Sequence, residues 1–382
     1  MADFVFKIQP NIILGAYTTA RLGQYVKEFG NKFMLIIDPI LKQVGVAEKV
    51  TNSLSDRKID FFTYDSIPAG ADTKVASDAL VLAREAHIDG IIAVGGGKTV
   101  SIARTICAVY NETKDLYDFV DGEVPKSAPL PLIALPTTLR DNFLFTNNAP
   151  IVDARSGKLK LVKTQTGLCK LALFDPNLPL SLSENQTAAM AIEILCIATE
   201  AYLSPRATFF SDMIAEKAVE LLSYAQEGSP SLTITTPKEV LFSQAGCMAS
   251  LASACSSSGA AELLALCLNA RHTISRSLST AILFPYIIED AAQYRSDRLA
   301  KISRLMRSAE SDSSDADAVK AFAEYVRQSI AKANLPSRLK DLSLNIEKLS
   351  LVAEDAGELD LMQSLQRSMT SDDLFEFIKK AF

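Results

Sequence analysis

Residues 90–99 read Gly90-Ile91-Ile92-Ala93-Val94-Gly95-Gly96-Gly97-Lys98-Thr99, an apolar run followed by three glycines and the start of a helical pattern. Glycines let the backbone turn tightly and bring its N–H groups close to an anion. The helix that follows adds its partial positive charge at the N-terminus. We therefore expect a phosphate-binding loop, with Thr99 as the helix N-cap and Lys98 as a phosphate partner. The stretch matches neither the P-loop nor the G-x-G-x-x-G pattern, and a left-handed glycine turn would have the same sequence.

Outward from this loop, short apolar runs alternate with amphipathic stretches over residues 1–180. Strands separated by helices predict parallel βαβ units, and thus an α/β domain; its role as a dinucleotide-binding domain is implied only by the family resemblance described below. The expected strands are Phe33–Asp38, Phe61–Asp65, Gly90–Val94, Pro131–Pro136 and Leu171–Asp175, and the clearest helices are Ala71–Ala86 and Thr99–Tyr110. Asn148–Val152 and Lys158–Lys163 flank the turn Asp153–Gly157, which predicts a hairpin attached to the sheet.

The second half of the chain has a different pattern. Over residues 181–382 the apolar spacing is close to 3.6, which predicts an all-helical domain. The clearest helices are Ala188–Tyr202, Ser211–Ala225, Val240–Ala254, Gly259–Asn269 and Leu278–Ala291. A cleft between the two domains is the expected site for a small-molecule substrate.

Composition excludes several classes of function. The 382 residues carry a net charge of −6, whereas a nucleic-acid-binding protein needs basic surfaces. There is no apolar run long enough to span a membrane, and residues 1–10 lack the features of a signal peptide, so we expect a cytoplasmic protein. Six cysteines without a C-x-x-C pair indicate reduced thiols. The two histidines, His87 and His272, exclude chemistry that needs three imidazoles from one chain.

Polar residues follow two of the predicted strands, where ligands of open parallel sheets bind. Asp38 follows Leu35-Ile36-Ile37 and is placed to accept hydrogen bonds from ribose hydroxyls. Thr137 and Thr138 follow Pro136. A capping or turn role before Pro39 explains Asp38 equally well, and a simple turn explains the two threonines.

Taken in order, these segments resemble the iron-containing alcohol dehydrogenase superfamily, which includes glycerol dehydrogenases and dehydroquinate synthase. The matching segments are Asn11-Ile12-Ile13-Leu14-Gly15, Asp38 with Gly45, the three glycines, Pro136-Thr137-Thr138, the hairpin, Asp175-Pro176, Glu200-Ala201-Tyr202 and Ala281-Ile282-Leu283-Phe284-Pro285-Tyr286. The resemblance implies a homodimer that binds NAD(P) at the glycine loop and acts on a small alcohol or carbonyl compound. The implied cofactor-binding residues are Asp38, Gly70, Gly95, Gly96, Gly97, Lys98, Thr99, Ser101, Thr137, Thr138 and Lys160. Asp38 favours NAD, because its charge would repel the 2′-phosphate of NADP.

The family's cofactor motifs are altered after two of these segments. Ser101 stands where the family has an aspartate, and Leu139-Arg140-Asp141-Asn142-Phe143 replaces a Gly-Thr-Gly-Ser type of stretch. Asp141 is a candidate to replace an aspartate that glycerol dehydrogenases carry near this position.

The family's metal ligands are altered as well. The resemblance implies an aspartate, a histidine four residues later and two histidines about fourteen residues apart. Those positions hold Glu193, Ile197, Glu262 and Arg276 in this chain. Because a guanidinium has no lone pair to donate to a cation, we expect the usual metal site to be lost and no metal to be bound.

Three hypotheses remain open for this position. In the first, Arg276 pairs with Glu193 and Glu262 and polarises a substrate carbonyl in place of the metal, although the same ion pair could merely fill vacated space. In the second, the chain is a catalytically inactive scaffold that serves binding or assembly. In the third, Glu193, Glu262 and His272 hold a metal. His272 is also the candidate general acid, unless it is a surface or capping residue.

Overall fold

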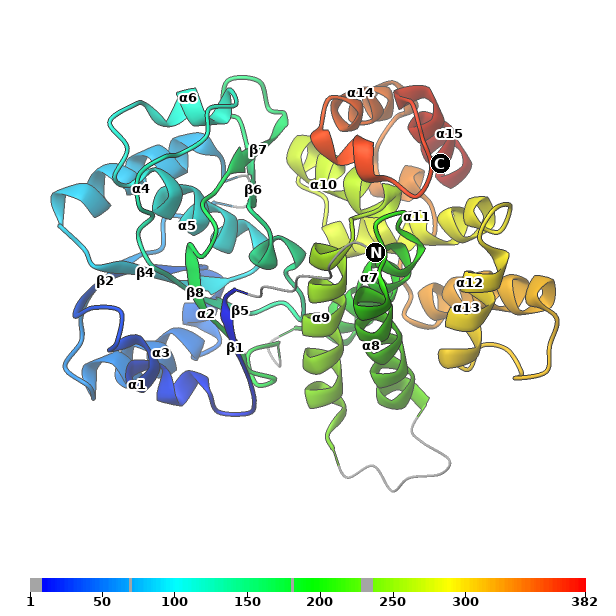
Figure 1. The fold of residues 1–382 in the computed structure, drawn as a ribbon, viewed down its shortest axis with the longest axis horizontal. Coiled ribbons are helices and arrows are strands. Elements are labelled where there is room, and N and C mark those ends of the chain that lie inside the picture. Colours follow the sequence, from blue (N-terminus) through cyan, green and yellow to red (C-terminus); the bar gives the residue numbers. More distant parts are fainter. Residues whose placement is uncertain (1–8, 69–70, 180–181, 228–235) are drawn as a thin grey trace, which may run out of the picture. The chain divides into compact units, whose positions relative to one another are not determined.

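The computed structural model describes residues 9–68, 71–179, 182–227 and 236–382. Its contacts divide the chain into two units, one of Met1–Arg155 with Lys160–Leu178 and one of Ser156–Leu159 with Pro179–Phe382. The predicted fold class is confirmed, because the first unit is α/β and the second is helical (Figure 1). Two stretches of the predicted first domain group with the second unit: Ser156–Leu159, where Lys158 pairs with Glu358, and the last two residues before the predicted boundary at 180.

The first unit is built on a six-stranded sheet with the order β1-β8-β5-β4-β2-β3. Every neighbouring pair in it is parallel. The strands are β1 (Asn11–Leu14), β2 (Lys32–Ile37), β3 (Asp60–Tyr64), β4 (Gly90–Gly95), β5 (Leu132–Pro136) and β8 (Cys169–Phe174). The five predicted strands are all present within two residues of their expected bounds, and β1 adds an edge strand that the apolar pattern alone did not predict.

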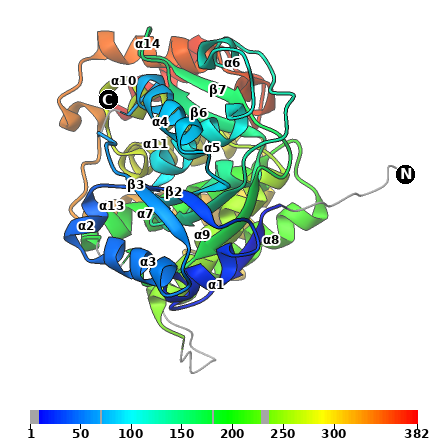
Figure 2. The ribbon, with the colours of Figure 1, turned by 90° about the vertical axis from the view of Figure 1, so that its left-hand side faces the viewer.

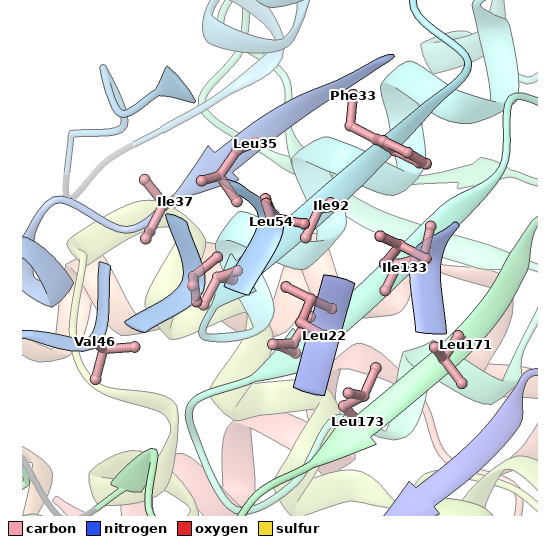
Figure 3. Packing of buried hydrophobic residues seen from close by; sticks show 14 of the residues in the cluster. Leu22, Phe33, Leu35, Ile37, Val46, Leu54, Ile92, Ile133, Leu171 and Leu173 are labelled. Carbon is pink, nitrogen blue, oxygen red and sulfur yellow. The ribbon is translucent and has the colours of Figure 1, made fainter. Parts of the chain in front are cut away.

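Helices cover both faces of this sheet (Figure 2). The helices α1 (Leu22–Val26) and α3 (Val46–Ser55) lie on one face, and α4 (Thr73–Glu85) and α5 (Gly97–Val109) lie on the other. Because successive strand residues point to opposite faces, alternate residues of β2 such as Leu35 and Ile37 join the core on the α1 and α3 side. Figure 3 shows Leu22 and Leu54 packed among them.

The order in which strands are added to the sheet changes direction between the neighbouring strands β2 and β4. From β2 the chain continues outward to β3, and from β4 it continues the other way to β5 and β8. The register pairs Ile37 with Val94 and Gly95 with Pro136, so the carboxyl ends of β2, β4 and β5 share one edge. Ligands of such sheets bind at this edge, beside the point of reversal.

The hairpin is present, but it is not attached to the main sheet. Its strands β6 (Asn148–Val152) and β7 (Leu159–Lys163) form a separate two-stranded sheet. Between them, Arg155 pairs with Asp121 and Asp153. The helices α2 (Ile40–Gln43) and α6 (Leu116–Val120) complete the first unit.

The second unit consists of helices. They are α7 (Glu184–Leu203), α8 (Phe209–Glu227), α9 (Lys238–Cys255), α10 (Ala260–His272), α11 (Arg276–Ala291), α12 (Ser296–Leu305), α13 (Asp315–Lys332), α14 (Ile346–Gly357) and α15 (Ser371–Ala381). A capping box between Ser183 and Gln186 fixes the start of α7. From Ala189 to Leu203 every residue of α7 is buried, so it is the central helix of this unit.

Among the described residues, no single helix combines the length and the apolar character needed to cross a membrane. The pair α9 and α10 passes that test jointly, with a bend of 103° between the two helices.

Candidate active site

The glycine loop begins on the central strand β4 and ends in α5. Gly96 is the residue before the helix, with φ −74° and ψ 178°, and no side chain caps its N–H groups. None of the three glycines has a positive φ, so the left-handed turn that the sequence allowed is absent here. The prediction of Thr99 as N-cap is wrong, since α5 begins two residues earlier and Thr99 is buried inside its first turn. The loop therefore places backbone N–H groups at a helix N-terminus whose N-cap residue makes no side-chain capping bond, which is the arrangement that an anion site uses.

Space explains at least one of these glycines. A Cβ built on Gly95 would lie 2.6 Å from Oγ1 of Thr99, so a larger residue would displace the first turn of α5. At Gly96 the added atom would reach Cγ2 of Thr138 at 3.4 Å, a tight but tolerable contact. Gly95 thus allows the close approach of the loop to Thr99, and Gly96 leaves room between the loop backbone and Thr138.

Two strand ends meet this loop. The backbone N–H of Thr137 donates to the carbonyl oxygen of Gly95 at 3.0 Å, and the N–H of Asp38 donates to that of Val94 at 3.0 Å. One carboxylate oxygen of Asp38 accepts the N–H of Ile40 at 3.2 Å, which is the turn role that the sequence also allowed. Burial lowers the pKa of Lys98, and the nearby charge of Asp38 partly offsets this effect. The loop, a cation and a carboxylate thus lie together at the ligand edge.

This set of groups fits a dinucleotide. The backbone N–H groups at the start of α5 and Lys98 suit a pyrophosphate, and Asp38 at the end of the adjacent strand suits a ribose. Of the other predicted cofactor residues, Ser101 is buried within α5, where its carbonyl oxygen accepts from Thr105. Lys160 is half-buried on β7, and its charge acts on Asp121. Gly70 lies outside the described residues.

The segment that replaces the family's glycine-rich stretch is well ordered by side-chain contacts. Asp141 is buried and caps the short 3-10 helix η2 (Asn142–Phe145) by accepting the N–H of Leu144 at 3.2 Å. The fully buried guanidinium of Arg104, on α5, donates to the carbonyl oxygens of Phe143 and Thr146. Arg104 is a functional candidate that the sequence analysis missed. The available signal was a lone arginine in a helix that is otherwise apolar or small.

The second unit brings together three predicted residues. Nη2 of Arg276, the first residue of α11, lies 3.4 Å from Oε1 of Glu262 on α10 and 3.8 Å from Oε1 of Glu193 on α7. The side chains of Glu193 and Glu262 are 1% and 2% exposed, and that of Arg276 is 15% exposed. Ser277, which the sequence analysis did not single out, donates its hydroxyl to Glu193. We call Glu193, Glu262 and Arg276 the guanidinium triad.

Comparison with known proteins gives the family of this chain. The model for iron-containing alcohol dehydrogenase matches residues 9–176, and the model for the C-terminal part of the Fe-containing alcohol dehydrogenase family matches residues 187–382. The chain belongs to the iron-containing alcohol dehydrogenase family. Membership classes it as an oxidoreductase of the alcohol dehydrogenase type.

Relatives match this chain over nearly its whole length. The probable alcohol dehydrogenase EutG of Escherichia coli (strain K12) is 27% identical over 97% of this chain and 92% of its own. The NAD-dependent methanol dehydrogenase of Bacillus methanolicus is 24% identical over 98% of this chain and 99% of its own. A solved 1,3-propanediol oxidoreductase has the same fold, with a TM-score of 0.90, 21% identity and full coverage of both chains.

The residues at the position where the resemblance implies the family's metal do not fit a metal ion. The guanidinium group of Arg276 lies within 4 Å of both acidic side chains and has no lone pair to donate. Within the described part of the chain, no group of three or more His, Cys, Asp or Glu side chains is arranged to hold a metal. The hypothesis of a metal held by Glu193, Glu262 and His272 therefore has no support.

His272 lies far from Glu262 along α10. Glu262 is in the first turn of this helix and His272 is its last residue, roughly 15 Å further along the axis. Burial lowers the pKa of His272, and its other close groups are Lys348, Arg271 and Asp355. Its role as general acid stays a prediction.

Proposed function

We propose that the chain is an NAD-linked oxidoreductase that acts on a small alcohol, aldehyde or ketone and uses Arg276 in place of a metal ion. Family membership and the similarity to an NAD-dependent methanol dehydrogenase support the reaction class and the cofactor. The observation that carries the metal-independent part is the guanidinium triad itself. A guanidinium lies within 4 Å of two buried carboxylates, and the resemblance implies that these three residues occupy positions of the family's metal ligands.

In this proposal Arg276 stabilises the charge that develops on the substrate oxygen. Fixed N–H donors aimed at a developing oxyanion are strongly stabilising in a site that excludes water. Among the residues that the structure describes, the buried Nε of Arg276 has no hydrogen-bond partner. A buried donor without an acceptor costs about 1–3 kcal/mol, and a substrate oxygen would remove that cost.

The two glutamates hold the guanidinium in place. Glu262 and Glu193 both approach the Nη2 atom of Arg276, and Nε points to no acceptor among the described residues. Ser277 fixes the Glu193 carboxylate by donating its hydroxyl to it. When bound, NADH supplies the hydride, and the chain's own residues supply orientation and charge.

We expect a preference for NAD over NADP. Asp38 follows the strand beside the glycine loop. There its carboxylate would accept hydrogen bonds from the ribose hydroxyls of NAD and repel the 2′-phosphate of NADP. Loss of that charge would weaken the discrimination.

The second candidate is a catalytically inactive binding module on the same scaffold. It is favoured by the fact that the two glutamates already compensate the Arg276 charge without a substrate. It predicts NADH binding or dimerisation without turnover.

NADH oxidation against a panel of small aldehydes and ketones, in the presence of EDTA, separates these proposals. We expect turnover with EDTA present, and a loss of at least about 100-fold in kcat/KM in Arg276→Met, as for removal of one oxyanion donor. Arg295→Met, which removes an arginine outside the triad, is the control and should keep its activity. No turnover with any carbonyl compound would leave the inactive module as the function.

We also propose a homodimer that binds neither nucleic acid nor membranes. The edge strand β1 pairs with β8 only, so its second edge is open in the described chain. A net charge of −6 opposes binding to nucleic acid. Light scattering after size-exclusion chromatography should give twice the chain mass, and a monomer at micromolar concentration would contradict the dimer.

A further inference from the structure

The central helix α7 directs two carboxylates at its neighbours. Glu193 and Glu200 lie two helical turns apart and thus share one face of α7. Both side chains are almost completely buried. Glu193 belongs to the guanidinium triad, whereas Glu200 has no part in the function proposed so far.

Glu200 holds the start of α10. Its two carboxylate oxygens accept the backbone N–H groups of Ala261 at 2.8 Å and of Glu262 at 3.3 Å. These are N–H groups that a helix start leaves without an internal partner. The bond to Glu262 reaches the same residue whose side chain contacts Arg276.

The neighbouring residues hold Glu200 closely. A Cβ on Gly259 would lie 2.1 Å from Cδ of Glu200, so only glycine lets the loop approach the carboxylate. The side chain of Gln366 donates to the backbone carbonyl oxygen of Glu200 at 3.2 Å. Glu200 is therefore fixed on both its main chain and its side chain.

The same arrangement occurs at the next helix. Glu193 accepts from Ser277 and lies beside Arg276, the first two residues of α11. One face of α7 thus anchors the first turns of α10 and α11, and these two turns carry the other members of the triad.

We propose that Glu200 is a positioning residue that fixes Glu262 against Arg276. This inference rests on the proposed function, because that function gives Arg276 its task. Glu200 does not contact the substrate; it acts through the backbone of Glu262.

The charges around Glu200 make the contact sensitive to pH. Burial, with a contribution from the charge of Glu262, raises the pKa of Glu200 to about 8, although its backbone hydrogen bonds act in the opposite direction. Other charged or titratable groups beside this pair, among the described residues, are Arg276 on α11, Glu193 and Cys196 on α7, and Tyr294 after α11. Above pH 8 the ionised Glu200 repels Glu262, so the position of Glu262 against Arg276 should change there.

The Nε–H resonance of Arg276, assigned with Arg276→Lys, reports on this position in the intact protein without requiring turnover. Glu262→Gln gives the shift expected when the contact changes. We expect Glu200→Leu to reproduce most of that shift, Glu200→Gln to give a smaller one, and Glu184→Gln, an exposed control on α7, to give none. In the wild type the resonance should titrate near pH 8, and in Glu200→Gln it should not.

Kinetics with the best carbonyl substrate complete the test. We expect Glu200→Leu to lower kcat at least tenfold with an unchanged Kd for NADH, and Glu200→Gln to recover part of kcat and remove the break near pH 8. If the wild type is inactive, the proposed function fails and the resonance alone decides the positioning role. If the wild type is active but both Glu200 variants keep the wild-type resonance, kcat and pH profile, the positioning role is refuted and the proposed function stands.

Discussion

Replacement of Arg276 by methionine tests the energetic account of the guanidinium triad. Methionine keeps much of the volume of arginine and removes its charge, so Glu193 and Glu262 remain buried without a cation. At separations of 3.4 and 3.8 Å, each lost attraction is about 4–5 kcal/mol at an effective dielectric constant of 20, before desolvation is counted. Removal of one partner from a buried ion pair costs about 3–5 kcal/mol in net stability. We expect a loss in that range at pH 7.

The assay is urea denaturation of the full-length protein, followed by far-ultraviolet circular dichroism. Two unpaired buried carboxylates take up protons on folding, so the loss in Arg276→Met should shrink as the pH falls from 8 to 5. The variant with Glu193→Gln and Glu262→Gln added should regain most of the stability, because no buried charge is left. A loss below about 1 kcal/mol at pH 7 that is independent of pH would refute the reasoning, since it would mean that the glutamates never depended on Arg276.

Three further predictions concern other parts of the molecule. Because the folded protein holds a proton on Glu200 up to about pH 8, whereas an unfolded glutamate loses it near pH 4.5, the free energy of unfolding should fall as the pH rises between these values. Glu200 should contribute about 1.4 kcal/mol per pH unit to this slope, a contribution that is absent in Glu200→Gln, and an equal slope in the variant would contradict the shift. Gly95→Ala should weaken NADH binding at least about tenfold by displacing Thr99, and Gly96→Ala should weaken it less. Because the chain has no tryptophan, the fluorescence emission of NADH itself is titrated to measure both affinities. Arg104→Met should destabilise the protein by about 3 kcal/mol or more, because three backbone and side-chain acceptors lose a buried donor. Thermal denaturation of Arg104→Met and of the wild type checks this prediction. An unchanged midpoint temperature would show that the segment after Thr138 keeps its conformation without Arg104.

Local patterns in the sequence predicted the fold well, because a parallel strand that is buried on both faces is a short apolar run, whichever strands are its neighbours. The runs at β2, β4 and β5 were therefore visible, whereas β1 was not, since its four residues are only partly buried. The start of α5 was misplaced, because threonine is a good N-cap by propensity. The bare glycine at position 96 takes that role instead, and no side chain caps the helix.

The candidate site was predictable only where a resemblance set the positions. It placed Glu193, Glu262 and Arg276 in one location, and the structure brings them together. The contacts of Arg104 and Glu200 link residues 39 to 62 positions apart, and no periodicity reports such pairs. His272 was a candidate because it is the only imidazole near the expected site in the sequence, but the length of α10 separates it from Glu262.

Elemental analysis of the purified protein, after incubation with Fe²⁺ or Zn²⁺ and removal of free metal, tests the central claim most directly. The Arg276→His variant is the matched comparison, because it restores a lone pair beside Glu193 and Glu262. We expect the wild type to retain far less than one metal ion per chain and still to oxidise NADH with a carbonyl substrate, and the variant to retain more metal than the wild type. One tightly held iron or zinc per wild-type chain, with turnover abolished by its removal, would contradict the account.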